Sequence, residues 1–164
     1  MITKSEYRDL AADVELLYTN YCEVLDDGNI DRWPNFFAND CLYRVTTKEN
    51  QERGMPLNFV FCEGLPMVRD RAAGLREAVF HRSRSQRRVI SGMRLKTLDG
   101  IDIGGIETCA TFLIYESLGD GPSQLLSCGR SSDVIVREGN ELKFKQRLCV
   151  IDARVMPDSL VYPI

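Results

Sequence analysis

The spacing of apolar residues changes once along the chain, near Arg87, and this change restricts the fold more than any other feature. Before it, the spacing of amphipathic helices predominates, with two shorter strand-like runs; after it, apolar residues recur in three or four long runs typical of strands. Turn-forming stretches separate these runs, which read "RRVISGMRLKT", "IETCATFLIYES", "QLLSCGRSSDVIVRE" and "ELKFKQRLCVIDARV". Helices followed by a meander of strands predict an α+β fold, with the N-terminal helices packed on one face of an antiparallel sheet.

The first thirty residues predict a long amphipathic helix. Thr3 and Glu6 have the spacing of a capping box, and Ile2 and Tyr7 have that of a hydrophobic staple. Gly28 suits the C-terminal end of the helix. The buried stripe is expected to consist of apolar residues at helical spacing: Leu10, Val14, Leu17, Tyr21 and Leu25.

The segment "DRWPNFFANDCLYRV" holds the only tryptophan of the chain. We expect Asp31 to cap a short helix in which Trp33, Phe36 and Phe37 lie on one side, facing the core. No acid–base machinery accompanies these aromatic residues, and large aromatics at helical spacing are more often core than binding site. The segment therefore indicates a packing seam between helices and sheet.

Two strands and a helix are expected to follow this seam. The run "CLYRVTT" alternates as a strand does, and "LNFVFCEG" places three apolar side chains on one face of a second strand: Leu57, Phe59 and Phe61. Pro66 suits the first turn of the next helix. The apolar stripe of that helix is expected to be Val68, Ala72, Leu75 and Val79.

The last strand alternates apolar and basic residues. The apolar set is Leu142, Phe144, Leu148 and Val150, and the basic set is Lys143, Lys145 and Arg147. Unbroken alternation predicts that the first set is buried and that the second set faces water.

Length and composition indicate one soluble domain, residues 1–164, because no linker or charge block divides the chain. A net charge of -3 gives no overall attraction to nucleic acid or anionic lipid. No apolar run approaches the roughly 18 residues that a membrane helix needs. The six cysteines form no C-x-x-C pair, and "MITKSEYRDL" lacks the apolar stretch of a signal peptide. We therefore expect reduced thiols and a cytoplasmic location.

Three segments, taken in order, carry a resemblance to a known family. They are "DRWPNFFANDCLYRVTTKEN", "MVRDRAAGLREAVF" with the basic "QRRVISGM" after it, and "SCGRSSDVIVREGNELKFKQRLCVIDARV". Their order and spacing resemble the cystatin-like, or nuclear transport factor 2-like (NTF2-like), fold. Within that fold the chain is most similar to the small, or beta, subunit of the aromatic-ring-hydroxylating (Rieske non-haem iron) oxygenases. The resemblance covers nearly the whole chain and implies a cone formed by one strongly curved antiparallel sheet.

This resemblance implies a non-catalytic structural subunit of a dioxygenase that acts in aromatic compound catabolism. The large, or alpha, subunit is then expected to hold a Rieske [2Fe-2S] cluster and a mononuclear iron. Three large and three small subunits are expected to form a hetero-hexamer, with homotrimer contacts among the small subunits. The stretch "YRVTTKENQERGMPL" resembles small subunits that serve hydroxylases of aromatic carboxylates such as salicylate or terephthalate.

The histidine count restricts which cofactors this chain can hold. A Rieske cluster needs two cysteines and two histidines, and a mononuclear non-haem iron needs two histidines and a carboxylate. The chain has a single histidine, His81, and its cysteines lack the paired spacings of zinc sites. We therefore expect no catalytic, cofactor-binding or metal-binding residue in this chain, only in its partner.

The alternative is a stand-alone NTF2-like isomerase or dehydratase with a pocket near Asp40 and Tyr43. Such enzymes use a carboxylate base and a tyrosine or acid inside the cone, and the available set is Asp40, Tyr43, Tyr115, His81 and Asp133. Asp40 equally suits an Asx-turn onto its own backbone. His81 equally suits the C-terminal end of a helix, where the helix dipole favours a positive charge.

The stretch from Arg69 to Arg88 is strongly basic, with seven arginines against Asp70 and Glu77. Nucleic-acid binding is disfavoured because the whole chain is acidic and no exposed aromatics are interleaved. Arginine makes two-pronged contacts with carboxylates. We therefore predict that this stretch is a docking surface for a partner protein.

Overall fold

The computed structural model describes residues 3–77, 84–97, 105–155 and 162–164. Its elements, in chain order, are α1 (Lys4–Asp26), the 3-10 helix η1 (Ile30–Phe36), β1 (Phe37–Thr47), α2 (Lys48–Glu52), β2 (Val60–Glu63), α3 (Gly64–Glu77), β3 (Arg84–Thr97), β4 (Ile106–Leu118), β5 (Gln124–Glu138) and β6 (Glu141–Ile151). In the described part of the chain, no helix is both long enough and apolar enough to cross a membrane.

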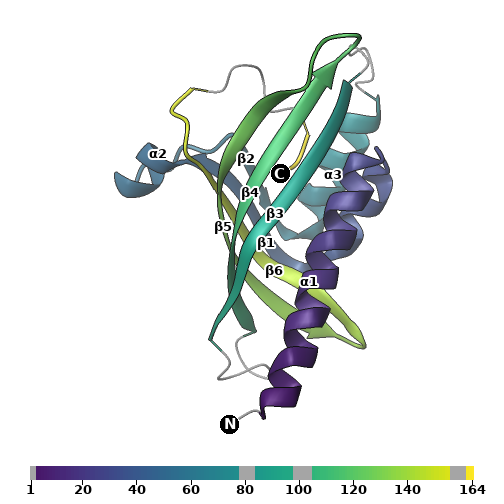
Figure 1. The fold of residues 1–164 in the computed structure, drawn as a ribbon, viewed down its shortest axis with the longest axis vertical. Coiled ribbons are helices and arrows are strands. Elements are labelled where there is room, and N and C mark those ends of the chain that lie inside the picture. Colours follow the sequence, from purple (N-terminus) through teal and green to yellow (C-terminus); the bar gives the residue numbers. More distant parts are fainter. Residues whose placement is uncertain (1–2, 78–83, 98–104, 156–161) are drawn as a thin grey trace.

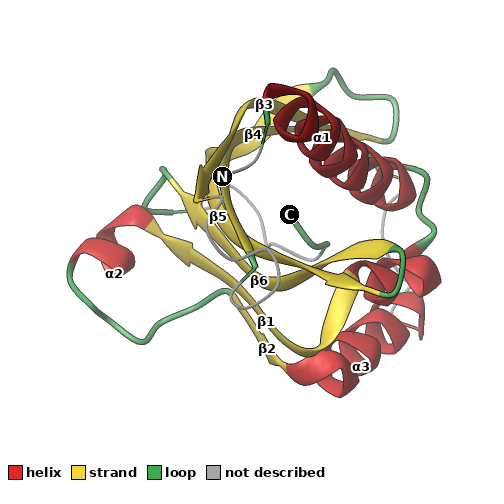
Figure 2. Cartoon of the chain, turned by 90° about the horizontal axis from the view of Figure 1, so that it is seen from below, coloured by secondary structure: helices red, strands yellow, loops and turns green. Residues whose placement is uncertain are grey.

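All six described strands belong to one curved sheet with the order β2-β1-β6-β5-β4-β3 (Figure 1). Helix α1 lies beside β3, and α3 lies beside β1, so that the two helices close the open side of the curve (Figure 2). The result is a cone, and the last described residues lie inside it (Figure 2). The predicted α+β class, with N-terminal helices on one curved sheet, is confirmed.

One strand pair departs from the antiparallel arrangement that the sequence predicted. Strand β1 pairs with β6 in parallel, whereas the other four pairings are antiparallel. A hairpin forces its two strands to be antiparallel, but β1 and β6 are not joined by one. The elements between them in the chain leave the direction of β1 free to be set by packing.

Helix α1 forms as predicted. The Thr3 hydroxyl accepts a hydrogen bond from the Glu6 amide at 3.2 Å, and the Glu6 carboxylate accepts one from the Thr3 amide at 2.7 Å, which completes the capping box. Gly28 follows the C-cap with φ of 74°, a left-handed conformation that suits glycine. All five residues of the predicted stripe are buried. The staple residue Ile2 lies outside the described residues, as does Val79 of the third helix.

The aromatic seam is confirmed, but its helix is a 3-10 helix whose N-cap lies two residues earlier than predicted, and Phe37 is the first residue of β1 instead of a residue of that helix. Trp33 and Phe37 are buried, with ring centres 5.4 Å apart, and Trp33 also meets Tyr43 at 5.5 Å. Asn29 occupies the N-cap position without a capping hydrogen bond from its side chain, so the predicted capping role of Asp31 is wrong. Asp31 falls in the first turn and pairs instead with Arg76 at 2.9 Å.

Strand β2 is an edge of the sheet and presents an apolar row to the outside. Its core-facing residues are Val60 and Cys62. Of the predicted strand face, only Phe61 lies in β2, because the strand begins at Val60 and Leu57 and Phe59 precede it. All three side chains are exposed, with exposed fractions of 57% for Leu57, 44% for Phe59 and 47% for Phe61. Large apolar side chains gathered on a surface usually mark an interface.

A β-bulge in β6 overturns the predicted exposure of Arg147. Phe144 pairs with Ile135 but Gln146 pairs with Val134, so one extra residue, Lys145, is inserted between them. Because successive side chains alternate between faces, the extra residue moves Arg147 to the same inner face as Phe144. Arg147 is therefore buried, where unbroken alternation had predicted that it faces water.

We expect two glycine substitutions to change stability in opposite directions. A Cβ atom at Gly129, in β5, would overlap the Val150 carbonyl oxygen and approach the Phe112 ring to 2.8 Å. Gly129→Ala should lower the free energy of unfolding by about 1–3 kcal/mol or more through overpacking. Gly74, in α3, has no atom near an added Cβ, so Gly74→Ala should raise it by about 0.5–1 kcal/mol. Urea unfolding measures both, and equal stability of Gly129→Ala and wild type would contradict the close packing.

Candidate functional site

A charged pair inside the cone is the centre of the candidate site. Arg147 on β6 and Asp133 on β5 are register partners on adjacent strands. The Arg147 Nη1 atom lies 3.0 Å from the Asp133 Oδ2 atom, and both side chains are fully buried. A buried charge is tolerated only when it is paired and hydrogen-bonded, so each residue depends on the other.

Aromatic residues of α1 and β6 enclose this pair. The Tyr18 hydroxyl donates a hydrogen bond to Asp133 Oδ2 and lies 2.8 Å from the Thr108 hydroxyl. The Arg147 guanidinium lies 4.5 Å from the centre of the Tyr21 ring and 4.9 Å from that of Phe144. These contacts are in the range of cation–π interactions. The charge is thus shielded by ring faces as well as by its carboxylate partner.

Burial changes the acidity of the groups in the cone. It raises the pKa of the Asp133 carboxyl, and the Arg147 charge only partly offsets this. Burial also raises the pKa of Tyr21 to about 12 and those of Tyr18 and Tyr43 further. The cause in each case is that the charged form loses its hydration. The three tyrosines are therefore hydrogen-bonding groups in their neutral form.

The residues that the sequence suggested for an enzyme do not come together. Asp133 and Tyr43 lie inside the cone, but Asp40 lies outside it, with a side chain 70% exposed that pairs with Lys145 at 3.2 Å. Tyr115 is 42% exposed, and His81 lies outside the described residues. A pocket near both Asp40 and Tyr43 is thus contradicted, because residues three apart on a strand point to opposite faces.

Sequence reasoning missed Arg147 and Tyr18. Arg147 sits among lysines, and no local signal marks the bulge that turns it inward. Tyr18 could have been found, because it lies one turn after Val14 and one turn before Cys22 on the buried face of α1.

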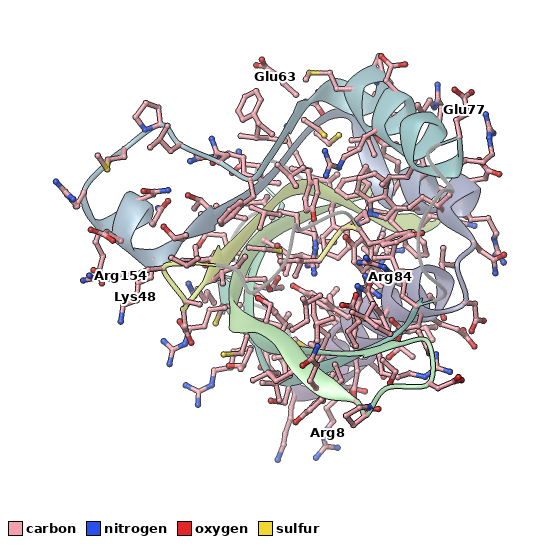
Figure 3. All side chains as sticks on the ribbon, turned by 90° about the horizontal axis from the view of Figure 1, so that it is seen from above. Arg8, Lys48, Glu63, Glu77, Arg84 and Arg154 are labelled. Atoms are coloured by element: carbon pink, nitrogen blue, oxygen red, sulfur yellow. The ribbon has the colours of Figure 1, made fainter. Side chains whose placement is uncertain are left out.

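Two arginines at the C-terminal end of the arginine-rich stretch, Arg84 and Arg88, turn inward, so the predicted docking surface is wrong for these two residues. The Arg88 Nη1 atom lies 2.5 Å from the Asp26 Oδ1 atom, and the Arg84 Nη1 atom lies 3.0 Å from the Glu116 Oε1 atom. Strand alternation turns Arg84, Gln86 and Arg88 inward together. In Figure 3, Arg84 lies toward the middle of the molecule, whereas labelled residues such as Glu77 lie at its periphery. Arg69 and Arg87 are exposed, and Arg82 lies outside the described residues.

No cluster of metal-ligating side chains appears among the described residues. Cys22, Cys41, Cys62 and Cys149 are buried as free thiols. The chain has one histidine, so its side chains cannot supply the ligands of a Rieske cluster or of a two-histidine iron site.

Comparison with known proteins finds relatives that are named as small or beta subunits of dioxygenases. No model of a protein family matches the chain. The small subunit of anthranilate 1,2-dioxygenase from Burkholderia cepacia is 28% identical over 152 residues, which are 93% of this chain and 92% of that protein. Subunit beta 1 of the terminal oxygenase component of terephthalate 1,2-dioxygenase from Comamonas sp. is 24% identical over 144 residues, 88% of this chain and 92% of that protein.

Solved structures show the same fold. One assigned as the beta subunit of an aromatic-ring-hydroxylating dioxygenase from Novosphingobium aromaticivorans has a TM-score of 0.85 and 24% identity over 96% of this chain and 99% of that one. The chain is an α+β protein with the NTF2-like cone. Its homologues are small, or beta, subunits of aromatic dioxygenases, which confirms the resemblance expected from the sequence.

We expect substitution in the buried Arg147–Asp133 pair to lower the free energy of unfolding far more than substitution in an exposed ion pair. Arg147→Met would leave the Asp133 carboxylate buried without a counter-charge, at a cost of about 3–5 kcal/mol of unfolding free energy. Adding Asp133→Leu to Arg147→Met should recover much of that loss. The control is Lys145→Met, whose exposed pair with Asp40 contributes at most about 1 kcal/mol. Urea unfolding tests the series, and equal losses for Arg147→Met and Lys145→Met would contradict the burial.

The raised tyrosine pKa values predict a loss of stability in alkali. Below pH ~10 the three tyrosines are neutral in both states and contribute no pH dependence. Above it, the unfolded chain releases these protons while the folded chain keeps them, so each tyrosine should lower stability by roughly 1.4 kcal/mol per pH unit. For Tyr21 this loss ends near its folded pKa of about 12. Urea midpoints between pH 8 and 11.5 measure the slope.

The control for this titration is Tyr21→Phe, which removes one of the three groups. Its slope above pH ~10 should be smaller than that of wild type by the contribution of one tyrosine, roughly 1.4 kcal/mol per pH unit. Buried cysteines whose pKa is also raised, such as Cys149 at about 12, contribute to the remaining slope. A wild-type protein with constant stability over this range would contradict the burial of the three hydroxyls.

Proposed function

We propose that the chain is a non-catalytic structural small, or beta, subunit of an aromatic-ring-hydroxylating oxygenase in aromatic compound catabolism. The observation that carries this proposal is the similarity to proteins named as small subunits of such dioxygenases, which covers about nine tenths of both chains. Because it is not confined to one segment, it supports a common role as well as a common fold.

The proposed partner is a large, or alpha, subunit that holds the Rieske cluster and the mononuclear iron, with three subunits of each kind in the complex. Exposed apolar side chains support assembly. One group is the row Leu57, Phe59 and Phe61 at the sheet edge, with Met67 at 43% exposure nearby in α3. Surfaces of this kind usually meet another protein. An edge strand also offers unpaired backbone groups to a partner.

A second exposed apolar group lies on the outside of the meander and supports contacts among small subunits. Tyr115 on β4 pairs with Leu125 on β5, and both are more than 40% exposed. Val89 on the other edge strand, β3, is exposed to a similar degree. The first group lies at the β2 edge of the sheet, and the second lies at and near the β3 edge. Each group therefore offers a separate surface, one for the large subunit and one for neighbouring small subunits.

The proposed substrate of the complex is an aromatic carboxylate. The relatives above are named for anthranilate and terephthalate, which both carry a carboxylate on an aromatic ring. The residues that recognise this substrate would belong to the large subunit, together with the iron. We therefore assign no substrate contact to this chain.

The alternative enzyme function has one observation in its favour: the cone holds a carboxylate, Asp133, beside the hydroxyl of Tyr18. Proton transfer of the isomerase or dehydratase kind uses such groups. Yet Asp133 is already bound by Arg147, and its side chain is fully buried. A carboxylate that is already paired with a buried arginine is held as a structural group and is not a free base, which favours the subunit proposal.

Co-expression with the large oxygenase subunit of the same organism tests the proposal. We expect a hexamer by light scattering, about one mononuclear iron per large subunit, and hydroxylation of anthranilate, salicylate or terephthalate only by the pair. The chain alone should be a trimer or poorly soluble, bind no stoichiometric iron and show no isomerase or dehydratase activity. A stable monomer that ignores the large subunit, or iron near one equivalent per isolated chain after chelation, would overturn the proposal.

A matched pair of variants locates the interface. Phe59→Ser with Phe61→Ser should reduce co-purification of the large subunit at least tenfold, because it removes apolar area from the centre of the exposed row. The control is Tyr7→Ser on α1, a side chain of similar exposure at 39%, which should leave assembly unchanged. Equal loss in both variants would mean that general solubility, and not this row, governs assembly.

A further inference from the structure

The outer face of β3, β4 and β5 carries a block of apolar side chains with an arginine at two opposite corners. The long helices α1 and α3 close the open side of the curved sheet, so they lie away from this face (Figure 2). Strand register places nine side chains in three rows, here called the outer block: Arg87, Tyr115 and Leu125; Val89, Leu113 and Cys128; Ser91, Thr111 and Arg130.

Strand alternation points the outer block away from the core. Residues between its members, such as Phe112 and Ile114, are buried on the inner face. Val89, Tyr115 and Leu125 are each more than 40% exposed. Exposed apolar side chains gathered on one surface usually mark an interface, and tyrosine and arginine are enriched among the residues that carry binding energy.

The outer block is basic, although the whole chain has a net charge of -3. Its nine side chains include two arginines and no carboxylate. Arg87 and Arg130 are exposed, and neither forms an ion pair within the described part of the chain. Arg87 lines a groove together with Glu23 of its own chain, but the two do not pair. The outer block therefore suits a partner that brings carboxylates.

The exposed side of α1 carries the opposite charge. Residues 4–27 hold seven carboxylates against two basic side chains. Exposed residues at helical spacing form a stripe along this helix, here called the α1 stripe: Asp9, Asp13, Leu16, Asn20, Glu23 and Asp27. Leu16, near its middle, is 57% exposed. The α1 stripe is thus an apolar contact with acidic groups on both sides of it.

The acidic end of α1 is unfavourable for the helix alone. Its last turn contains no basic residue, and Glu23, Asp26 and Asp27 lie where the helix dipole favours positive charge. Arg88 pairs with Asp26, whereas Glu23 and Asp27 form no ion pair with another described residue. A positive group from another chain is therefore favoured at this end.

The α1 stripe also lines a concave surface. Together with η1 and the β5–β6 hairpin, its residues from Asp13 onward enclose a groove of about 710 Å³. The opposite wall includes Phe36 and Leu142, with Arg32 and Arg137. Arg137 Nη2 lies 3.8 Å from Asp13 Oδ2, a weak pair between exposed side chains. The outer face of a curved sheet is convex, so its projecting side chains fit such a groove.

The charges of the two surfaces have the same spacing. Arg87 and Arg130 are two strands and four residues apart, a distance of about 16 Å with Leu113 midway. Asp13 and Glu23 are ten residues apart, a distance of about 15 Å along the helix with Leu16 between them. The helix can therefore cross the outer block with a carboxylate near each arginine and Leu16 near Leu113.

A ring of three copies needs two different surfaces on each chain, because each copy meets one neighbour with one surface and the next with another. We propose that the outer block of one copy docks on the α1 stripe of the next copy, with arginines facing carboxylates around an apolar centre. This inference rests on the proposed function, because it supplies the interface of the proposed small-subunit trimer.

Charge reversal tests the contact by light scattering of the chain over a dilution series. Arg87→Glu with Arg130→Glu should weaken the trimer about tenfold or more, because like charges then face each other. Asp13→Lys with Glu23→Lys should weaken it to a similar degree. A chain that carries all four substitutions has opposite charges facing each other again and should recover the trimer.

The control makes the same change in net charge elsewhere. Arg53→Glu with Arg69→Glu alters two exposed residues outside both surfaces and should leave the trimer unchanged. Circular dichroism of every variant verifies that it is folded.

The native Cys128 gives a second test that also works in the complex with the large subunit, should the chain alone be poorly soluble. In Leu16→Cys, a short bismaleimide should link the new thiol to Cys128 of the next copy, and Cys128→Ser in the same chain should abolish the link. The control is Tyr7→Cys, nine residues earlier and on the opposite side of α1, which should give no link.

The outcomes separate this inference from the proposed function. A wild-type trimer that resists both charge reversals, or that shows no link through Leu16→Cys, would overturn this interface and leave the subunit role standing. Loss of the large subunit from the variants, with an intact small-subunit trimer, would assign the outer block to the large subunit and also overturn it. A wild-type chain that forms no trimer, alone or in the complex, would contradict the proposed assembly itself.

Discussion

The contact between Arg147 and Asp133 is the constraint on which the rest of the cone depends. Two opposite charges without access to water must face each other, and they do so only because the bulge at Lys145 turns Arg147 inward. Helix α1 then supplies Tyr18 to the carboxylate and Tyr21 to the face of the guanidinium. The packing of the helix on the sheet is thus specified by polar contacts as well as by apolar area.

A filled interior and exposed apolar side chains on the outside both favour the proposed subunit role over an enzyme role for this chain. An enzyme of this shape needs an open cone with a free base, whereas here Asp133 is paired with Arg147 and Ile164 is hydrogen-bonded to the Tyr43 hydroxyl inside the cone. The exposed apolar side chains lie instead at the sheet edge, around Phe59 and Phe61, and on the outside of the meander. These exposed side chains support the proposed subunit role, whereas the fold alone does not decide function.

The sequence predicted those features that local physics decides and missed those that depend on tertiary pairing. The capping box of Thr3 and Glu6, and the long strands, follow from spacing within a few residues. The burial of Arg147 depends on one inserted residue in a distant pairing, and no local pattern reports it. The separation of Asp40 from Tyr43 was predictable, since an odd spacing on a strand places two side chains on opposite faces.

The buried pair also has a consequence for the register of β5 and β6. Side chains alternate with a period of two, so a slip of one residue in β6 would move Arg147 to the outer face and bring Leu148 opposite Asp133. Asp133 would then be buried without a counter-charge, which is among the costliest arrangements in a protein interior. A buried ion pair adds little net stability compared with apolar packing, but it strongly disfavours the wrong register. The same slip would move the buried Phe144 and Ile151 to the outer face, so the ion pair and the apolar residues of β6 specify one register together.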